Sequence, residues 1–152
     1  TGVQTCALPI SLLYFQKMSL TPASVVAYYL GNPEQYLPPR SYQGLLEVSH
    51  FHLFAVGMLL LVLTHLVLFC PFKTWLKITL ITTPFVSALV DEGGGWLVRF
   101  VGPEFAIVKI VGFVVLQASL ALLVILSLWA IFVGTQNDYE GDLDFDEDGP
   151  PL

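Results

Sequence analysis

Charged side chains are scarce in this chain. Only 12% of its 152 residues are charged and 55% are hydrophobic, whereas soluble domains carry roughly 25% charged residues. An ordinary soluble domain is therefore excluded, because a chain of this length cannot bury so much apolar surface. The net charge of −6 reflects a single acidic tail and no basic surface for nucleic acid, since seven of the twelve acids are Asp138, Glu140, Asp142, Asp144, Asp146, Glu147 and Asp148.

Cysteine and nucleotide-binding motifs are also missing. The two cysteines, Cys6 and Cys70, form no Cys-x-x-Cys pair and no disulfide framework. No Gly-x-x-x-x-Gly-Lys segment occurs, and the glycines at 93–95 are not followed by Lys and Ser or Thr. We therefore expect neither nucleic acid nor nucleotide as a partner.

Long apolar runs are present instead. Phe51–Cys70 covers the ~30 Å hydrocarbon layer of a bilayer at ~1.5 Å per residue. In the next run only Ile78–Val90 is free of charge, and these residues form ~20 Å of helix, which is too short to cross the bilayer. The helix is therefore expected to continue through Asp91 and Glu92 to a hinge at Gly93–Gly95. The predicted fold class is an all-α, polytopic transmembrane helical bundle, with full spans at about 44–70, 75–92 and 105–133.

The predicted transmembrane domain covers residues 18–133, and both ends differ from it. Residues 1–10 resemble a translated sequencing adapter and are left out of the fold prediction. Residues 11–17 are interpreted as the remnant of a truncated first span. Residues 18–43 are predicted as a loop containing a short helix at Pro22–Leu30, and residues 134–152 as a disordered acidic tail.

Lysine placement predicts the orientation. Lys73 and Lys77 lie in the short connection between the first two full spans, which marks that side as cytoplasmic under the positive-inside rule. The loop at 18–43 and the segment Gly93–Glu104 then lie outside, and the acidic tail lies inside.

The candidate site is a cluster of Glu47, His50 and His52 where the first full span begins. Glu47 and His50 are spaced i, i+3, as in Glu-x-x-His metal sites of helical bundles, whereas His52 lies ~200° from His50 on an ideal helix. The topology places Asp91 and Glu92 on the same membrane face, so these five residues form a hypothetical zinc, iron, copper or manganese site. The alternatives are an interfacial cluster that binds head groups and water, and a proton-handling or substrate role.

Two other polar side chains, His65 and Gln117, are predicted at membrane depth. A buried ionisable residue favours function, whereas a neutral His65 bonded to Thr64, Thr82 or Thr83 would be structural. Lys109 is expected to snorkel to the nearby interface.

A haem is less expected than a transition metal. Bis-His ligation normally takes its histidines from different helices, and all three histidines here lie on or beside one helix. A second ligand would have to come from Met58, the lost first span, a second copy of the chain or a partner subunit.

Three segments carry a family resemblance: Thr21-Pro-Ala-Ser-Val-Val-Ala-Tyr-Tyr29, Gly44-Leu-Leu-Glu-Val-Ser-His-Phe-His-Leu-Phe54 and Trp96-Leu-Val-Arg-Phe-Val-Gly-Pro-Glu-Phe-Ala106. Through them the chain resembles a family of small bacterial four-span membrane proteins that are often mislabelled as a translation elongation factor. The resemblance implies a helical membrane fold and a location in the bacterial inner membrane, but no activity.

The leading hypothesis is an accessory or redox-associated membrane component with an outward-facing Glu/His metal site and no identified catalytic residue. Its expected partners are the lipid bilayer and either a membrane protein partner or a second copy of the chain. The alternative is a structural or lipid-interacting membrane subunit with no metal or catalytic site. A small transporter is the third hypothesis, supported only by His65 and Gln117.

Overall fold

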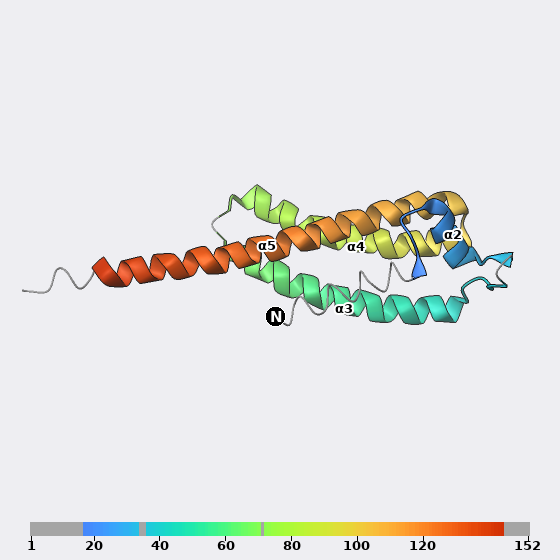
Figure 1. Ribbon diagram of the computed structural model, residues 1–152, viewed down its shortest axis with the longest axis horizontal. Coiled ribbons are helices and arrows are strands. Elements are labelled where there is room, and N and C mark those ends of the chain that lie inside the picture. Colours follow the sequence, from blue (N-terminus) through green and yellow to red (C-terminus); the bar gives the residue numbers. More distant parts are fainter. Residues whose placement is uncertain (1–16, 34–35, 71, 145–152) are drawn as a thin grey trace, which may run out of the picture.

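The computed structural model describes residues 17–33, 36–70 and 72–144. Among these residues the chain forms only helices, apart from an isolated bridge between Asn32 and Leu37, so the all-α prediction is confirmed. The elements are α2 (Pro22–Leu30), α3 (Tyr42–Leu68), α4 (Thr74–Phe100), the 3-10 turn η2 (Pro103–Phe105) and α5 (Ala106–Asp144) (Figure 1).

Local signals explain where α2 and α3 begin. The Thr21 side chain accepts a hydrogen bond from the first turn of α2, and Pro22 occupies its first position. α2 ends at Gly31, whose φ of +86° lies in the region that favours glycine. Ser41 caps α3 by accepting a hydrogen bond from the backbone N–H of Gly44. The helix predicted at Pro22–Leu30 is therefore confirmed with the same bounds.

The three long helices lie side by side, and α2 packs at the end of the bundle where α3 begins and α4 ends (Figure 1). Arg99 Nε donates a hydrogen bond of 2.7 Å to the carbonyl oxygen of Arg40. This bond ties the segment before α3 to the last turn of α4. The α2–α3 connection and the turn before α5 thus lie at the same end of the bundle.

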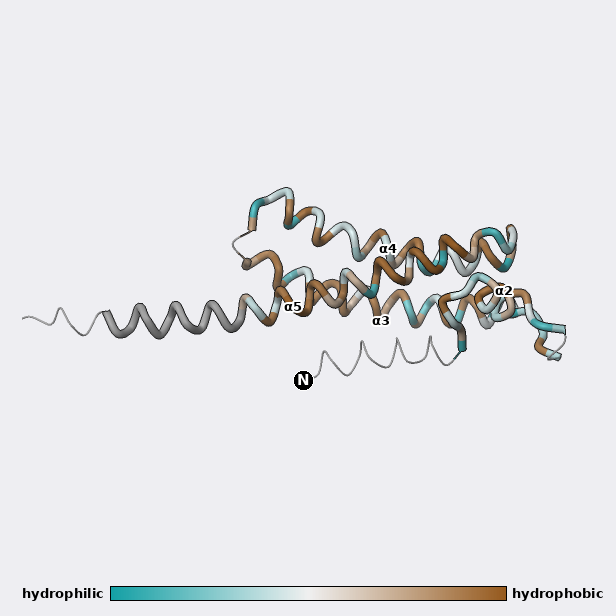
Figure 2. The backbone as a smooth tube through the Cα atoms, turned by 45° about the horizontal axis from the view of Figure 1, so that its top comes forward, coloured by the Kyte–Doolittle hydropathy of each residue, from teal (hydrophilic) through white to brown (hydrophobic). Residues whose placement is uncertain are grey.

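Two helical segments are long and apolar enough to cross a membrane, judged by length and composition over the described residues. They are α3, with 27 residues, and the 28-residue segment Pro103–Ala130, which consists of η2 and of α5 up to Ala130. Apolar residues cover much of both segments (Figure 2). α4 is as long as α3 but is not among the candidates.

The glycines at 93–95 do not form the predicted hinge, because α4 is continuous from Thr74 to Phe100. Two of them allow close packing instead. A Cβ on Gly94 would lie 2.8 Å from Cα of Lys109, and one on Gly95 would lie 2.6 Å from the hydroxyl oxygen of Tyr29. Small residues let neighbouring helices approach closely, and this packing outweighs the low helix propensity of glycine.

α5 also extends further than predicted. Its helix reaches Asp144, and residues 145–152 lie outside the described residues. Disorder of the segment 134–152 stays a prediction. A helix that has formed adds one hydrogen bond for each further residue. No proline occurs after Pro103 until Pro150, so no residue on the way removes a backbone donor.

The apolar core consists of two clusters. One lies at the α2 end and includes Val25, Tyr29, Leu45, Val98, Ala106 and Phe113. The other lies further along the bundle and includes Val56, Leu60, Leu63, Val67, Ala88, Leu116, Leu120 and Leu123. The positions of α3 and α4 between these clusters carry polar residues, among them Ser49, His52, Asp91 and Glu92.

Replacing Gly94 by alanine is expected to lower the stability of the bundle by about 1–3 kcal/mol, because the added methyl group meets the backbone of Lys109. Gly93→Ala is the matched control, since a Cβ there meets nothing within 4 Å. Both variants gain the same helix propensity. Thermal unfolding in detergent, followed by circular dichroism, measures the difference, and equal melting temperatures for the two variants would contradict the close packing.

Candidate functional site

A buried ion pair joins α4 to α5. Lys109 Nζ donates a hydrogen bond of 2.7 Å to Asp91 Oδ1, and the two side chains are only 6% and 4% exposed. A charge buried without a partner is strongly destabilising, and a charge-assisted hydrogen bond offsets part of that penalty. Asp91 and Lys109 therefore depend on each other within the bundle.

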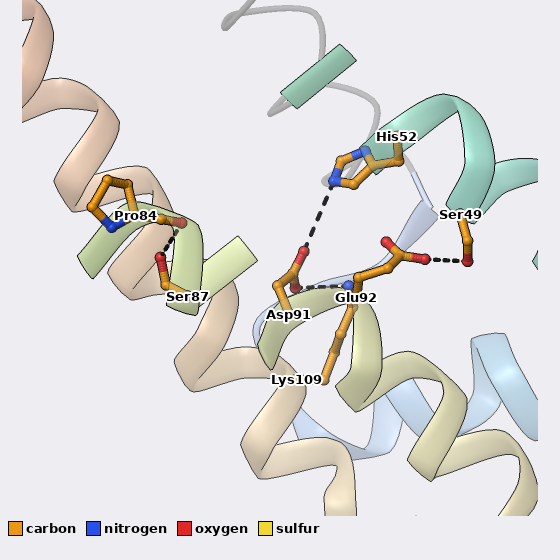
Figure 3. Close-up of polar contacts among 7 residues, drawn as sticks. All are labelled: Ser49, His52, Pro84, Ser87, Asp91, Glu92 and Lys109. Atoms are coloured by element: carbon orange, nitrogen blue, oxygen red, sulfur yellow. Dashed lines mark hydrogen bonds and ion pairs between the residues drawn. The ribbon is translucent and has the colours of Figure 1, made fainter. Parts of the chain in front are cut away.

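His52 approaches the same carboxylate from α3. Its Nε2 lies 4.0 Å from Asp91 Oδ2, a distance longer than a direct hydrogen bond, and its side chain is 28% exposed. Figure 3 shows the imidazole pointing toward one Asp91 oxygen while Lys109 contacts the other. Asp91 thus lies between nitrogen groups of two other helices.

A second polar contact joins α3 to α4 one residue along. Ser49, which is buried, donates a hydrogen bond to Glu92 Oε1 (Figure 3). The same hydroxyl oxygen accepts a bond of 2.8 Å from the indole Nε1 of Trp96. The Ser49 hydroxyl is therefore used both as donor and as acceptor, and it fixes the carboxylate of Glu92 and the indole.

Five of these side chains border a cavity of about 240 Å³: His52, Asp91, Glu92, Trp96 and Lys109. One part of its lining is charged or polar and the other part is apolar, from Phe113 through Leu116 to Leu120 on α5 and Val56 on α3. Lys109 and Leu120 are separated by ~16 Å along an ideal helix. The polar part of the lining includes Lys17, Tyr28, Tyr29, Arg40, His52, Asp91, Glu92, Trp96, Lys109 and Gln117.

The structure brings together only part of the predicted metal site. His52, Asp91 and Glu92 line the cavity, but Glu47 and His50 are exposed. Glu47 Oε1 accepts a hydrogen bond from Gln43 on the same helix, and the His50 ring lies against Phe51.

Among the side chains that the structure describes, no group of three or more His, Cys, Asp or Glu is placed to hold a metal ion. Two of the five predicted ligands, Glu47 and His50, are exposed, and one oxygen of Asp91 is bound by Lys109. The metal site therefore stays a prediction, without support from this arrangement.

His65 and Gln117, the two polar residues predicted at membrane depth, differ in their burial. His65 is exposed, with its ring 5.5 Å from that of Phe69, so its predicted burial among the helices is not observed. Thr64 turns inward instead and donates a hydrogen bond of 2.6 Å to the carbonyl oxygen of Leu60. Gln117 is partly buried and lines the cavity.

Sequence reasoning missed the role of Lys109. The lysine was expected to snorkel to the interface, but it is 5% exposed and bound to Asp91. A signal was available, because opposite charges on two helices joined by a short connection are candidates for a buried pair. Ser49 and Trp96 were also missed, since nothing in their sequence context distinguishes them from ordinary interfacial residues.

Comparison with known proteins gives one match. A family model, Aq_1264_TM, described as a transmembrane helical domain, matches residues 19–138 of the 152. No curated protein matches the chain, and no solved structure does.

Removing either partner of the buried pair is expected to destabilise the bundle by about 3–5 kcal/mol, because the other charge stays buried without a counter-charge. Asp91→Asn and Lys109→Met each leave one such charge, whereas the double variant leaves none and should recover most of the lost stability. Lys73→Met is the control, since Lys73 is exposed and makes no side-chain capping bond. Thermal unfolding of the four variants measures the coupling, and additive losses would show that the pair contributes nothing as a pair.

Proposed function

The chain belongs to the Aq_1264_TM family of transmembrane helical domains, and we propose that this membrane protein binds an amphiphilic small molecule. The molecule would have a polar head and an apolar tail, and it would occupy the cavity bordered by α2, α3, α4 and α5. We place the protein in the bacterial inner membrane as a multi-pass component.

The observation that carries this proposal is the change of polarity along the cavity. On α5 the lining passes from Lys109 to Phe113, Leu116 and Leu120 within ~16 Å, with Gln117 as the one polar residue along this apolar part. Small-molecule sites commonly combine an apolar lining with a few convergent polar groups. A molecule with one polar and one apolar end matches both parts of this lining, whereas a wholly polar or wholly apolar molecule matches only one.

The buried pair supports the proposal because it supplies polarity without leaving an unbalanced charge. Lys109 neutralises Asp91, and Ser49 already occupies one oxygen of Glu92. The indole of Trp96 and the phenol of Tyr28 add aromatic surface with a polar edge, which is typical of groups at a membrane interface. These groups would orient a polar head by hydrogen bonds and ring contacts, and the proposal includes no reaction at the site.

A redox-associated or accessory role with a metal is the second candidate. One observation favours it, the approach of His52 to Asp91 at 4.0 Å. Imidazole with carboxylate suits a transition metal. Lys109 would have to leave Asp91 before both carboxylate oxygens could coordinate such an ion. A structural subunit that binds no small molecule is the remaining alternative.

The orientation proposed for this site is outward. Lys73 is the N-cap of α4 and Lys77 lies in its first turn, at the end of α3 far from α2. The positive-inside rule assigns this end to the cytoplasm. The cavity would then open near the outer face, beside α2 and the segment before α3.

Single cysteines test this orientation in a background with Cys6 and Cys70 replaced by serine. Leu37→Cys, at an exposed position of the α2–α3 connection, should react with a membrane-impermeant maleimide in intact cells. Lys73→Cys should react only after the cells are permeabilised. The reverse pattern would place the cavity at the cytoplasmic face.

Leu116→Trp is expected to fill the apolar part of the cavity and to weaken binding of a fluorescent single-chain fatty acid by about tenfold or more. Leu122→Trp is the matched control, because Leu122 is 45% exposed on the same helix whereas Leu116 is 4% exposed. Fluorescence titration measures affinity, and circular dichroism confirms folding of both variants.

Unchanged affinity in a folded Leu116→Trp variant would contradict the cavity as the binding site. Elemental analysis and an absorption spectrum of the same purified protein decide the second candidate. A stoichiometric transition metal that Asp91→Asn removes would favour that candidate over amphiphile binding.

A further inference from the structure

A second cavity lies beside the first and shares part of its wall. Its volume is about 670 Å³, and four residues line both cavities: Lys17, Tyr28, Arg40 and Gly44. Its remaining lining comes from α2 and the connection to α3, and includes Ser24, Ala27, Asn32, Leu37, Pro38, Pro39 and Ser41. The two cavities therefore meet at the residues that they share.

Positive charge is concentrated at this junction. Lys17 and Arg40 line the second cavity, and no Asp or Glu is among its described lining residues. The whole chain has only six Lys and Arg against twelve Asp and Glu, and two of the six cations line this second cavity. The acids of the first cavity, Asp91 and Glu92, are not among the described residues that line the second. Both ion pairs found among the described residues involve Asp91, and neither includes Lys17 or Arg40.

Arg40 is held in place by contacts that leave its charge unneutralised. Its guanidinium carbon lies 4.3 Å from the centre of the Tyr28 ring. Its backbone N–H donates to the carbonyl oxygen of Tyr29 at 3.1 Å, and its own carbonyl oxygen accepts from Arg99. A guanidinium fixed in this way can donate two parallel hydrogen bonds to a carboxylate or phosphate.

We propose that the junction binds an anionic head group, a carboxylate or a phosphate, whose attached chain extends along the apolar wall past Phe113 toward Leu120. This inference rests on the proposed function and names the class of its ligand. Arg40 and Lys17 contact the anion, and the already paired Asp91 and Lys109 belong to the polar part of the lining, between the anion and the apolar wall. A cationic head group is disfavoured at the junction, because Lys17 and Arg40 lie there and the described lining of the second cavity holds no acid.

The test compares single-chain amphiphiles of one chain length that differ only in the head: carboxylate, phosphate monoester, alcohol and quaternary ammonium. Affinities are measured with purified protein in uncharged detergent, by displacement of the fluorescent fatty acid. We expect the two anionic compounds to bind about tenfold more tightly than the alcohol, because hydrogen bonds between charged groups are stronger than those to a neutral hydroxyl. Raising the salt concentration should reduce this preference.

Charge variants connect the preference to the two residues. Lys17→Gln and Arg40→Gln should each weaken the anionic compounds about tenfold and leave the alcohol unchanged, whereas Lys17→Arg should retain the preference. Because Arg40 also packs on Tyr28, Arg40→Lys tests whether charge alone suffices. Lys73→Gln, at the opposite end of the bundle, is the control and should have no effect.

The outcomes separate this inference from the proposed function. Equal binding of all four head groups overturns the anionic site but leaves amphiphile binding intact. Binding of none of the compounds overturns both. Displacement by inorganic phosphate alone, as effective as by the phosphate amphiphile, overturns the role of the chain and identifies the junction as a site for free anions.

Discussion

The ion pair between Asp91 and Lys109 is the interaction on which the arrangement of this bundle depends. Both groups are almost fully buried, and neither could remain charged there without the other. The pair fixes where α5 lies against α4, because the short lysine–aspartate distance leaves little freedom for either helix to slide or rotate. It also limits what the neighbouring side chains can do, since it occupies one oxygen of the buried Asp91 carboxylate.

Two glycines make the pair possible. Gly94 lies against the backbone of Lys109, and Gly112 lies against that of Asp91, where a Cβ would be 2.6 Å from the amide nitrogen. Each charged residue is therefore opposed by a glycine of the partner helix. The close approach brings the backbones together, excludes competing solvent and shortens the distance that the lysine must reach. Packing of small residues and pairing of charges thus reinforce each other at one crossing.

The same crossing shapes the cavity. Because Asp91 and Lys109 neutralise each other, the remaining charges of the lining are Lys17, Arg40 and Glu92, and the Glu92 carboxylate is hydrogen-bonded by Ser49. The apolar part follows from the leucines and Phe113 on the next turns of α5. An amphiphile with an anionic head fits this distribution. A metal ion fits it poorly, because the carboxylate best placed to coordinate it is bound to a lysine.

The amino-acid sequence by itself determined the class of protein and the local bounds of its helices. Composition and apolar runs indicated a helical membrane protein, and Thr21, Pro22 and Gly31 placed α2 where the structure has it, because caps and hydropathy depend on residues close in the chain. Tertiary structure decided the rest. The pairing of Asp91 with Lys109, the exposure of His65 and the continuity of α4 through Gly93–Gly95 depend on how each helix is rotated against its neighbours. That rotation is set by contacts between distant residues, which the periodicity of a single helix does not contain.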